Sequence, residues 1–187
     1  MKVFMDTEFT GLHQRTTLIS IGLVDENNSA LYIILNDYNE SQVNDWVQKN
    51  VIKNLEIDIN HLASHHLDLD LNMYYDCSQE KCAEILTQWL YESDIEIWSD
   101  CLAYDWVLFR ELFNNVLPEN INTVPRDLST YFAIMNLDPD ISRSVFSEIN
   151  GTKHNALDDA IMTKACHEKL TALYNRETRY VKDIEVW

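Results

Sequence analysis

The N-terminal segment reads Lys2-Val3-Phe4-Met5-Asp6-Thr7-Glu8-Phe9-Thr10-Gly11-Leu12, an apolar run that ends in two carboxylates and a turn. The run predicts a first strand over residues 2–8. Because successive side chains on a strand point to opposite faces, Asp6 and Glu8 should lie side by side and Thr7 should face the other way. Two like charges at that separation repel each other and resist ionisation. The pair therefore indicates either a solvated strand end or a site for a hard divalent cation such as Mg²⁺ or Mn²⁺.

The length and composition of the chain predict a single compact domain. Its 187 residues suit one domain spanning residues 1–187, and a hydrophobic fraction of 46% provides a core. No apolar stretch reaches the length of a membrane span, and the first residues resemble a strand rather than a secretion signal. The four cysteines show no CxxC spacing, which favours ordinary thiols in a reducing compartment over a zinc site. We therefore expect a soluble, cytoplasmic protein with no membrane association.

The formal net charge of −17 argues against a long, nonspecific surface for duplex nucleic acid, because such surfaces are usually basic. The charge is unevenly distributed. Residues 1–142 hold 7 Lys and Arg against 24 Asp and Glu, whereas residues 143–187 hold 7 of each. A small site for a strand end needs few phosphate contacts, and bound metal ions would add positive charge there. The total charge fits a merely soluble acidic protein equally well.

The pattern of apolar residues predicts a mixed sheet flanked by helices. Strands are expected over residues 2–8, 17–24, 30–35 and 95–98, with a short one near 123–124. Helices are expected over residues 41–51, 79–91, 105–116, 128–135 and 155–174. Residues 54–76 are ambiguous and are interpreted as an excursion between elements. Short connections make the first three strands an antiparallel meander, and the later alternation of strand and helix adds parallel strands, so the fold class is α/β.

A further carboxylate, Asp105, lies where a predicted strand gives way to a helix. It precedes Leu108 and Phe109 by about one turn, so it should point toward the buried face of that helix. A carboxylate in this place is either an N-terminal helix partner or a group aimed into a site. Asp100, a few residues earlier, is better placed for a loop or a cap.

The segment from residue 151 to residue 160 combines a glycine turn with the start of a helix. His154 stands just before this helix and Asp159 in its second turn. Considered individually, His154 favours a surface or capping role, and Asp159 with its acidic neighbour favours a solvated pair. Ala156 and Ala160 are small and one turn apart, so the helix can pack close to a sheet. That packing would bring Asp159 near the ends of the strands.

Together the three segments resemble the DEDD superfamily of 3′–5′ exonucleases, in its histidine-bearing branch (DEDDh). The first motif of that family, Asp-x-Glu-x-Thr-Gly-Leu, is matched by Asp6, Glu8, Thr10, Gly11 and Leu12. The second, an aromatic residue before an Asp, is matched by Tyr104 and Asp105. The third, His-x-Ala-x-x-Asp-Ala, is matched by His154, Ala156, Asp159 and Ala160. Order and spacing agree, and the resemblance covers residues 2 to about 170.

Within the superfamily, the chain is most similar to small bacterial exoribonucleases of the RNase AS type. This resemblance depends on residues 46–55, on Ala103-Tyr104-Asp105 and on Val124-Pro125-Arg126. Cys101 departs from the pattern, since many relatives carry Asn four residues before the Asp.

The resemblance implies a ribonuclease-H-like fold and a metal-dependent 3′–5′ exoribonuclease that acts on the 3′ ends of single-stranded RNA and releases nucleoside 5′-monophosphates. It implies two Mg²⁺ or Mn²⁺ ions bound by Asp6, Glu8, Asp105 and Asp159, a general base at His154, and a homodimer. An ordinary histidine pKa near 6.5 suits the base. Residues flanking the motifs could stack on the terminal bases, the candidates being Phe9, Leu12 and Tyr104. Trp106 is expected in the core instead.

Two other functions remain open at this stage. The chain could be a 3′–5′ exodeoxyribonuclease that trims or proofreads single-stranded DNA, because the residues that meet a 2′-OH cannot be read from the sequence. It could also be a non-catalytic binding module with a relict site, but the presence of all four carboxylates and the histidine argues against that function.

Two other groups of polar residues are open to a functional and a plain interpretation. Arg126, Arg143 and Lys153 are either phosphate contacts or ordinary surface charge, and the latter is favoured. A histidine-rich segment superficially suggests another metal site, and its members are His61, His65, His66, Asp68 and Asp70. We interpret it as a polar loop or a frayed helix, because such short motifs arise often by chance.

Overall fold

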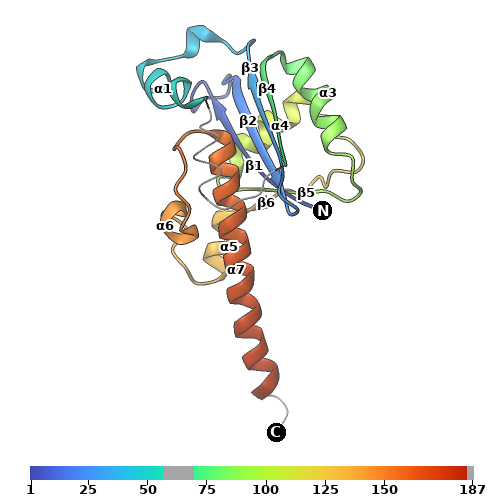
Figure 1. The fold of residues 1–187 in the computed structure, drawn as a ribbon, viewed down its shortest axis with the longest axis vertical. Helices are drawn as coiled ribbons and strands as arrows, with labels where there is room; N and C mark the ends of the chain where they lie inside the picture. The colour runs from blue at the N-terminus through green and yellow to red at the C-terminus, as the bar shows by residue number, and fades with distance from the viewer. Residues whose placement is uncertain (57–69, 185–187) are drawn as a thin grey trace.

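The computed structural model describes residues 1–56 and 70–184, which build a six-stranded sheet with helices on both faces (Figure 1). The strands are β1 (Lys2–Phe9), β2 (Leu18–Asp25), β3 (Ser29–Leu35), β4 (Asp70–Cys77), β5 (Glu96–Ser99) and β6 (Arg126–Asp127). The helices are α1 (Asp45–Asn50), α3 (Gln79–Trp89), α4 (Leu102–Leu112), α5 (Leu128–Ile134), α6 (Arg143–Ser147) and α7 (Ala156–Ile184), with the 3-10 helices η1 (Glu40–Gln42) and η2 (Ile52–Asn54).

The sheet has the strand order β4-β3-β2-β1-β5-β6. Strands β1, β2 and β3 form the predicted antiparallel meander. The remaining pairs, β1 with β5, β3 with β4, and β5 with β6, are parallel. The predicted fold class is therefore confirmed, and β1 lies inside the sheet with its carboxyl end between the ends of its neighbours.

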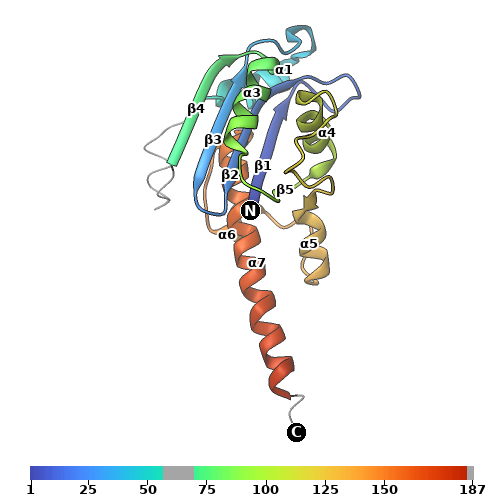
Figure 2. The same cartoon turned by 90° about the vertical axis from the view of Figure 1, so that its right-hand side faces the viewer.

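Alternation along β1 divides the core into two layers. Val3 and Met5 pack in a cluster with residues of α3 and α4, such as Leu86 and Phe109. Phe4, between them, packs on the opposite face against the first turns of α7. Figure 1 and Figure 2 show α7 running along the sheet and continuing well beyond it. None of the described helices combines the length and apolar character that crossing a membrane requires.

The start of α7 lies directly against β2. A Cβ atom added to Gly22 would stand 2.4 Å from backbone atoms of Ala156, so only glycine fits there. Ala156 and Ala160 are fully buried against the sheet, as their size predicted. Because Gly22 is the β2 partner of Asp6, this close packing sets the second turn of α7 beside the carboxyl end of β1.

Several elements differ from the prediction. Most of strand β4 (Asp70–Cys77) falls in residues 54–76, which we interpreted as an excursion. The strand was missed because an edge strand half-exposed to solvent carries no continuous apolar run. The helix expected over 41–51 is a short α1 between two 3-10 helices, and the strand expected near 123–124 lies instead at β6. Helix α6 was not predicted, α4 begins three residues early, and α7 extends to Ile184. The histidines His61, His65 and His66 fall outside the described residues.

Candidate active site

Three carboxylates meet where β1 ends and α7 begins. Asp6 and Glu8 lie on the same face of β1, as the alternation predicted, and Asp159 reaches them from the second turn of α7. One oxygen from each of the three lies within 4.8 Å of the others. Glu8 is buried, while Asp6 and Asp159 are partly exposed.

The fourth predicted carboxylate, Asp105, is held beside this cluster rather than inside it. Its side chain is buried near the start of α4. Thr7 Oγ1 donates a hydrogen bond to Asp105 Oδ1 at 2.6 Å, and Ser99 Oγ donates to Oδ2. The negative charge of Asp105 nevertheless raises the pKa of Asp6 more than any other single charge does. The sequence did not reveal the two hydroxyl donors, although Thr7 was expected on the opposite face of β1.

Burial and mutual repulsion make these carboxylates hard to ionise together. Burial raises the pKa of Asp6 well above its usual value, and the neighbouring carboxylates raise it further. Burial, then the charges of Asp159 and Asp105, raise the pKa of Glu8 to about 8. Burial, then the adjacent Asp158, raise the pKa of Asp159 to about 7. For Asp105 the pKa rises to about 6, because burial outweighs its two hydroxyl hydrogen bonds. Hard carboxylate oxygens in such a cluster fit Mg²⁺ or Mn²⁺, which would remove the repulsion.

His154 stands at the edge of the cluster, in the loop before α7. Its Nδ1 lies 4.0 Å from Glu8 Oε1, and its side chain is 41% exposed. Its backbone has a φ of 59°, in the left-handed region, and its N–H donates to Asp159 Oδ2 at 3.1 Å. Partial burial and the charge of Lys153 lower the pKa of the imidazole, so the ring is neutral at neutral pH and able to accept a proton.

The backbone on both sides of His154 is tied to η2 by two amides that the sequence did not reveal. Asn54 Nδ2 donates to the carbonyl of Lys153 at 2.8 Å. In return, Asn155 Nδ2 donates to the carbonyl of Asn54 at 2.7 Å. Asn155 is buried and also contacts the hydroxyl of Tyr32 at 3.3 Å. We call this pair the asparagine clamp, since it fixes the two neighbours of a residue whose backbone conformation is unfavourable.

All the predicted site residues line one cavity of about 510 Å³. The carboxylates and the histidine among them are Asp6, Glu8, Asp105, His154 and Asp159, and the three others are Phe9, Leu12 and Tyr104. Phe9 and Tyr104 stack on each other, with ring centroids 5.1 Å apart and an interplanar angle of 19°. Leu12 is 79% exposed at the rim. Flat rings and an exposed apolar side chain next to an anionic floor suit a nucleotide.

Other residues of the cavity wall were not predicted as site residues. Trp46, from α1, is 54% exposed and meets the His154 ring edge-on, with centroids 5.0 Å apart. In the sequence, Trp46 was an apolar position at helical spacing and the first residue of the segment 46–55 that resembles RNase AS, but it was not assigned to the site. The exposed thiol of Cys101 also borders the cavity. Trp106 packs partly buried against Phe109, in agreement with its predicted place in the core.

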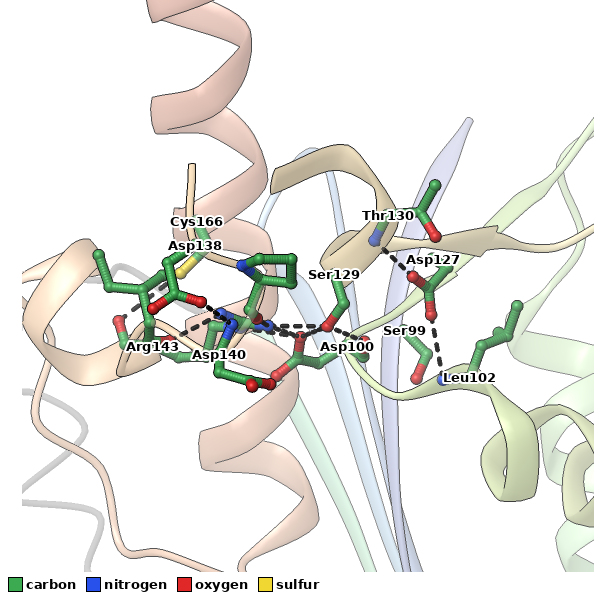
Figure 3. A network of polar contacts seen from close by, with 12 residues as sticks. Ser99, Asp100, Leu102, Asp127, Ser129, Thr130, Asp138, Asp140, Arg143 and Cys166 are labelled. Atoms are coloured by element: carbon green, nitrogen blue, oxygen red, sulfur yellow. Dashed lines mark hydrogen bonds and ion pairs between the residues drawn. The ribbon is translucent and has the colours of Figure 1, made fainter. Parts of the chain in front are cut away.

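Two of the three candidate phosphate contacts are engaged elsewhere. The Arg143 guanidinium pairs with Asp100 at 2.7 Å and donates to Ser129 Oγ at 2.8 Å and to two backbone carbonyls (Figure 3). Arg126 pairs with Glu96 at 3.3 Å. Lys153 is exposed, and the described residues give it no ion pair. The Asp100–Arg143 pair ties the loop before α4 to α5 and α6, which supports the position of Asp105.

Comparison with solved structures supports the fold. Crystal structures of E. coli exonuclease I superimpose on the chain with TM-scores of 0.59 for a complex with a dT13 oligonucleotide and 0.57 for a zinc-bound complex with single-stranded DNA. The identities are 12% and 11%, so the likeness concerns the fold alone. The matches cover 96% and 97% of this chain but 42% of each exonuclease I chain.

Comparison of sequences identifies the family. No protein with a curated description is significantly similar to the chain. The family model of the 3′-5′ exoribonuclease Rv2179c-like domain matches residues 1–171, which include β1, the start of α4 and the N-terminal half of α7. The chain therefore belongs to the Rv2179c-like 3′-5′ exoribonuclease domain family.

Proposed function

We propose that the protein is a metal-dependent 3′–5′ exoribonuclease of the histidine-bearing DEDD type, similar to RNase AS. It would hydrolyse phosphodiester bonds from the 3′ end of single-stranded RNA and release nucleoside 5′-monophosphates. The observation that carries this proposal is the cluster of Asp6, Glu8 and Asp159 within 4.8 Å, on the floor of a cavity with apolar walls. The family of the chain agrees with this activity.

The carboxylates would bind two divalent cations, Mg²⁺ or Mn²⁺. Asp6, Glu8 and Asp159 supply the converging oxygens, and Asp105 would complete the set from its place beside them. When bound, such ions stabilise the charge on the attacking and leaving oxygens of a phosphoryl transfer. Without a cation, burial and the neighbouring carboxylates raise the pKa values of Glu8 and Asp159 to about 8 and about 7. A bound cation would favour the ionised forms of both groups.

The other residues of the cavity would bind the strand end and move the proton. His154 is neutral near pH 7 and borders the cluster, so it can take a proton from the attacking water. Phe9 and Tyr104 already stack on each other and offer one ring face for the terminal base. Leu12 would cover that base from the rim and exclude water.

The nature of the polynucleotide is the main alternative within this proposal. The family description favours RNA. Single-stranded DNA is the second candidate, since E. coli exonuclease I, which shares the fold, has been crystallised with dT13. A homodimer and a cytoplasmic location remain predictions from the resemblance and the composition.

One degradation assay tests the proposal. RNA and DNA of equal sequence, single- and double-stranded and labelled at each end in turn, are incubated with the protein and Mg²⁺ or Mn²⁺. We expect stepwise shortening of 5′-labelled single-stranded RNA, early release of a 3′ label as a mononucleotide, and no reaction in EDTA. Internal cleavage, or equal activity in EDTA, would refute the proposal, whereas faster shortening of DNA would select the second candidate.

A further inference from the structure

The cations of this acidic chain are sorted by position. The chain has 14 Lys and Arg against 31 Asp and Glu. The cations that form ion pairs are Lys2, Lys81, Arg126, Arg143, Lys164 and Lys169. Of the other described cations, Arg110 donates to the carbonyl of Asn115, and Arg176 lies on the part of α7 beyond the sheet. Neither these side chains nor those of the remaining described cations line the cavity itself, but four of the latter lie on segments that do.

Four exposed cations on segments that border the cavity form no ion pair among the described residues, and we call them the cationic rim: Arg15, Lys49, Lys53 and Lys153. They come from three segments that each contribute residues to the wall of the cavity. Arg15 follows Leu12 in the β1–β2 loop, the two other lysines follow Trp46 in α1 and η2, and Lys153 precedes His154.

Hydrogen bonds hold the three segments of the cationic rim together. Gln42 Nε2, in η1, donates to the carbonyl of Arg15 at 2.8 Å, which joins the β1–β2 loop to the segment before α1. The asparagine clamp joins the end of η2 to the carbonyl of Lys153. Lys49 follows Trp46 by three residues, so both lie on the same side of α1. The three segments are thus joined to one another beside the Trp46 wall of the cavity.

Acidic residues near the cationic rim do not neutralise it. Asp45 stands four residues before Lys49, a spacing that allows an ion pair, yet no pair within 4.0 Å forms between them among the described residues. Glu40 and Glu56 are exposed and likewise form none. These four cations therefore lack ion pairs among the described residues, although the protein is strongly acidic. Positive charge of this kind beside the cavity suits an anionic partner.

We propose that the cationic rim binds the backbone phosphates of a single-stranded polynucleotide on the 5′ side of the nucleotide in the cavity. The inference rests on the proposed function, because it requires that the cavity receives a strand end. The rest of the acidic surface repels the strand, so the rim defines its path toward the carboxylates. Because RNA and DNA share the phosphate backbone, the rim should not distinguish the two sugars. It should favour strands that are long enough to reach it from the cavity.

The test compares two triple variants that change the net charge equally. K49Q/K53Q/K153Q removes the lysines of the rim, and K2Q/K81Q/K169Q removes lysines that are ion-paired away from the cavity. For each protein, kcat/KM on a single-stranded twelve-nucleotide RNA or DNA is measured from 50 to 200 mM KCl at constant Mg²⁺. Circular dichroism and thermal melting check that both variants are folded.

Each phosphate contact to a single strand contributes about 0.7 to the slope of log affinity against log salt. Three lost contacts should therefore make the slope of the rim variant shallower by about 2, so that kcat/KM falls roughly 16-fold less than for wild type over this fourfold salt range. The control variant should keep the slope of the wild type, and R15Q should lose about 0.7.

The outcomes separate this inference from the proposed function. If the wild-type protein degrades neither RNA nor DNA, the proposed function fails and the rim with it. If it degrades a polynucleotide but the rim variant and the control variant have equal slopes, the rim binds no phosphate backbone and only this inference is overturned. A rim variant that does not fold is replaced by the three single variants, each with an expected loss of about 0.7.

Discussion

Carboxylates near the ends of the central strands fall into two groups, Asp100 with an arginine partner and a cluster of three without one among the described residues. Asp100 is paired with Arg143 at 2.7 Å, and the guanidinium is further fixed by Ser129 and two carbonyls. The group formed by Asp6, Glu8 and Asp159 has no Lys or Arg partner among the described residues, and its pKa values rise accordingly. The charge of Asp100 is neutralised by a side chain of the protein, and the pair connects parts of the fold. The other three carboxylates have no such side chain in the described part of the chain, so this uncompensated group is available to bind a cation from solution.

Removing one carboxylate from the uncompensated group should have the largest effect. We expect Asp159→Asn to abolish Mg²⁺-dependent hydrolysis, since one of the three converging oxygens is lost, and to raise the melting temperature of the metal-free protein, since repulsion is relieved. The matched control is Asp158→Asn, which changes the same charge at a residue that accepts from the Thr152 N–H at 2.6 Å. Hydrolysis by the Asp159 variant at the wild-type rate would contradict a metal role for this group.

The histidine at the border of the uncompensated group should matter next. We expect His154→Asn to lower kcat by about a hundredfold, the usual range for loss of a general base. Asparagine tolerates the left-handed backbone at this position, so the variant should fold. The shift in melting temperature produced by Mg²⁺ should remain, because the carboxylates are intact. A variant with unchanged kcat would exclude His154 as the base.

Breaking the compensated pair should affect stability before activity. Arg143→Gln leaves Asp100 without its cation, at side chains that are 14% and 28% exposed. We expect a loss of about 2–4 kcal/mol in the free energy of unfolding, below the value for fully buried pairs. Lys81→Gln, which breaks the exposed pair with Glu84, should leave the free energy of unfolding almost unchanged. Urea unfolding at constant pH measures both, and equal losses would remove the proposed contrast between the two groups.

The group formed by Asp6, Glu8 and Asp159 should make the stability of the metal-free protein depend on pH. In the metal-free protein the pKa values of Glu8 and Asp159, about 8 and about 7, exceed those of the unfolded chain, so the folded state holds more protons near neutrality. Rising pH removes these protons and favours unfolding. The free energy of unfolding in EDTA should therefore fall from pH 6.5 to pH 8, and Glu8→Gln should flatten that dependence. A stability that rises over this range would contradict the raised pKa values.

The sheet could be predicted from local patterns, whereas the grouping of Asp105, His154 and Asp159 with Asp6 and Glu8 was implied by the family resemblance. Period-two alternation put Asp6 beside Glu8, and small residues at Ala156 and Ala160 indicated the close packing of α7. Edge strand β4 escaped prediction, since half of its residues face solvent and lack an apolar signal. The partners of Asp105 also escaped, because Ser99 and Thr7 reach it through tertiary contacts between strands and α4.

The region around His154 is held in place by neutral amides and not by an ion pair. The asparagine clamp fixes the backbone on either side of the histidine through bonds of 2.8 and 2.7 Å. Asn54→Ala removes the bond to Lys153 and a second bond from the same amide to the carbonyl of Asn50 at 2.7 Å. We expect kcat to fall about tenfold with little change in KM, the effect usual for partners that orient a functional group. Asn50→Ala is the matched control, since that amide donates only within its own helix, to the carbonyl of Trp46 at 2.8 Å.

A purely structural role for Asn54 predicts a different result. Each lost hydrogen bond should lower the free energy of unfolding by about 1 kcal/mol, and Asn54→Ala loses two such bonds whereas Asn50→Ala loses one. If both variants keep the same kcat and differ only in stability, the clamp only supports the fold. If Asn54→Ala lowers kcat in the wild-type background but causes no further loss when it is added to His154→Asn, the amide acts through the imidazole. The position of His154, the proposed general base, would then depend on a hydrogen bond from an uncharged amide.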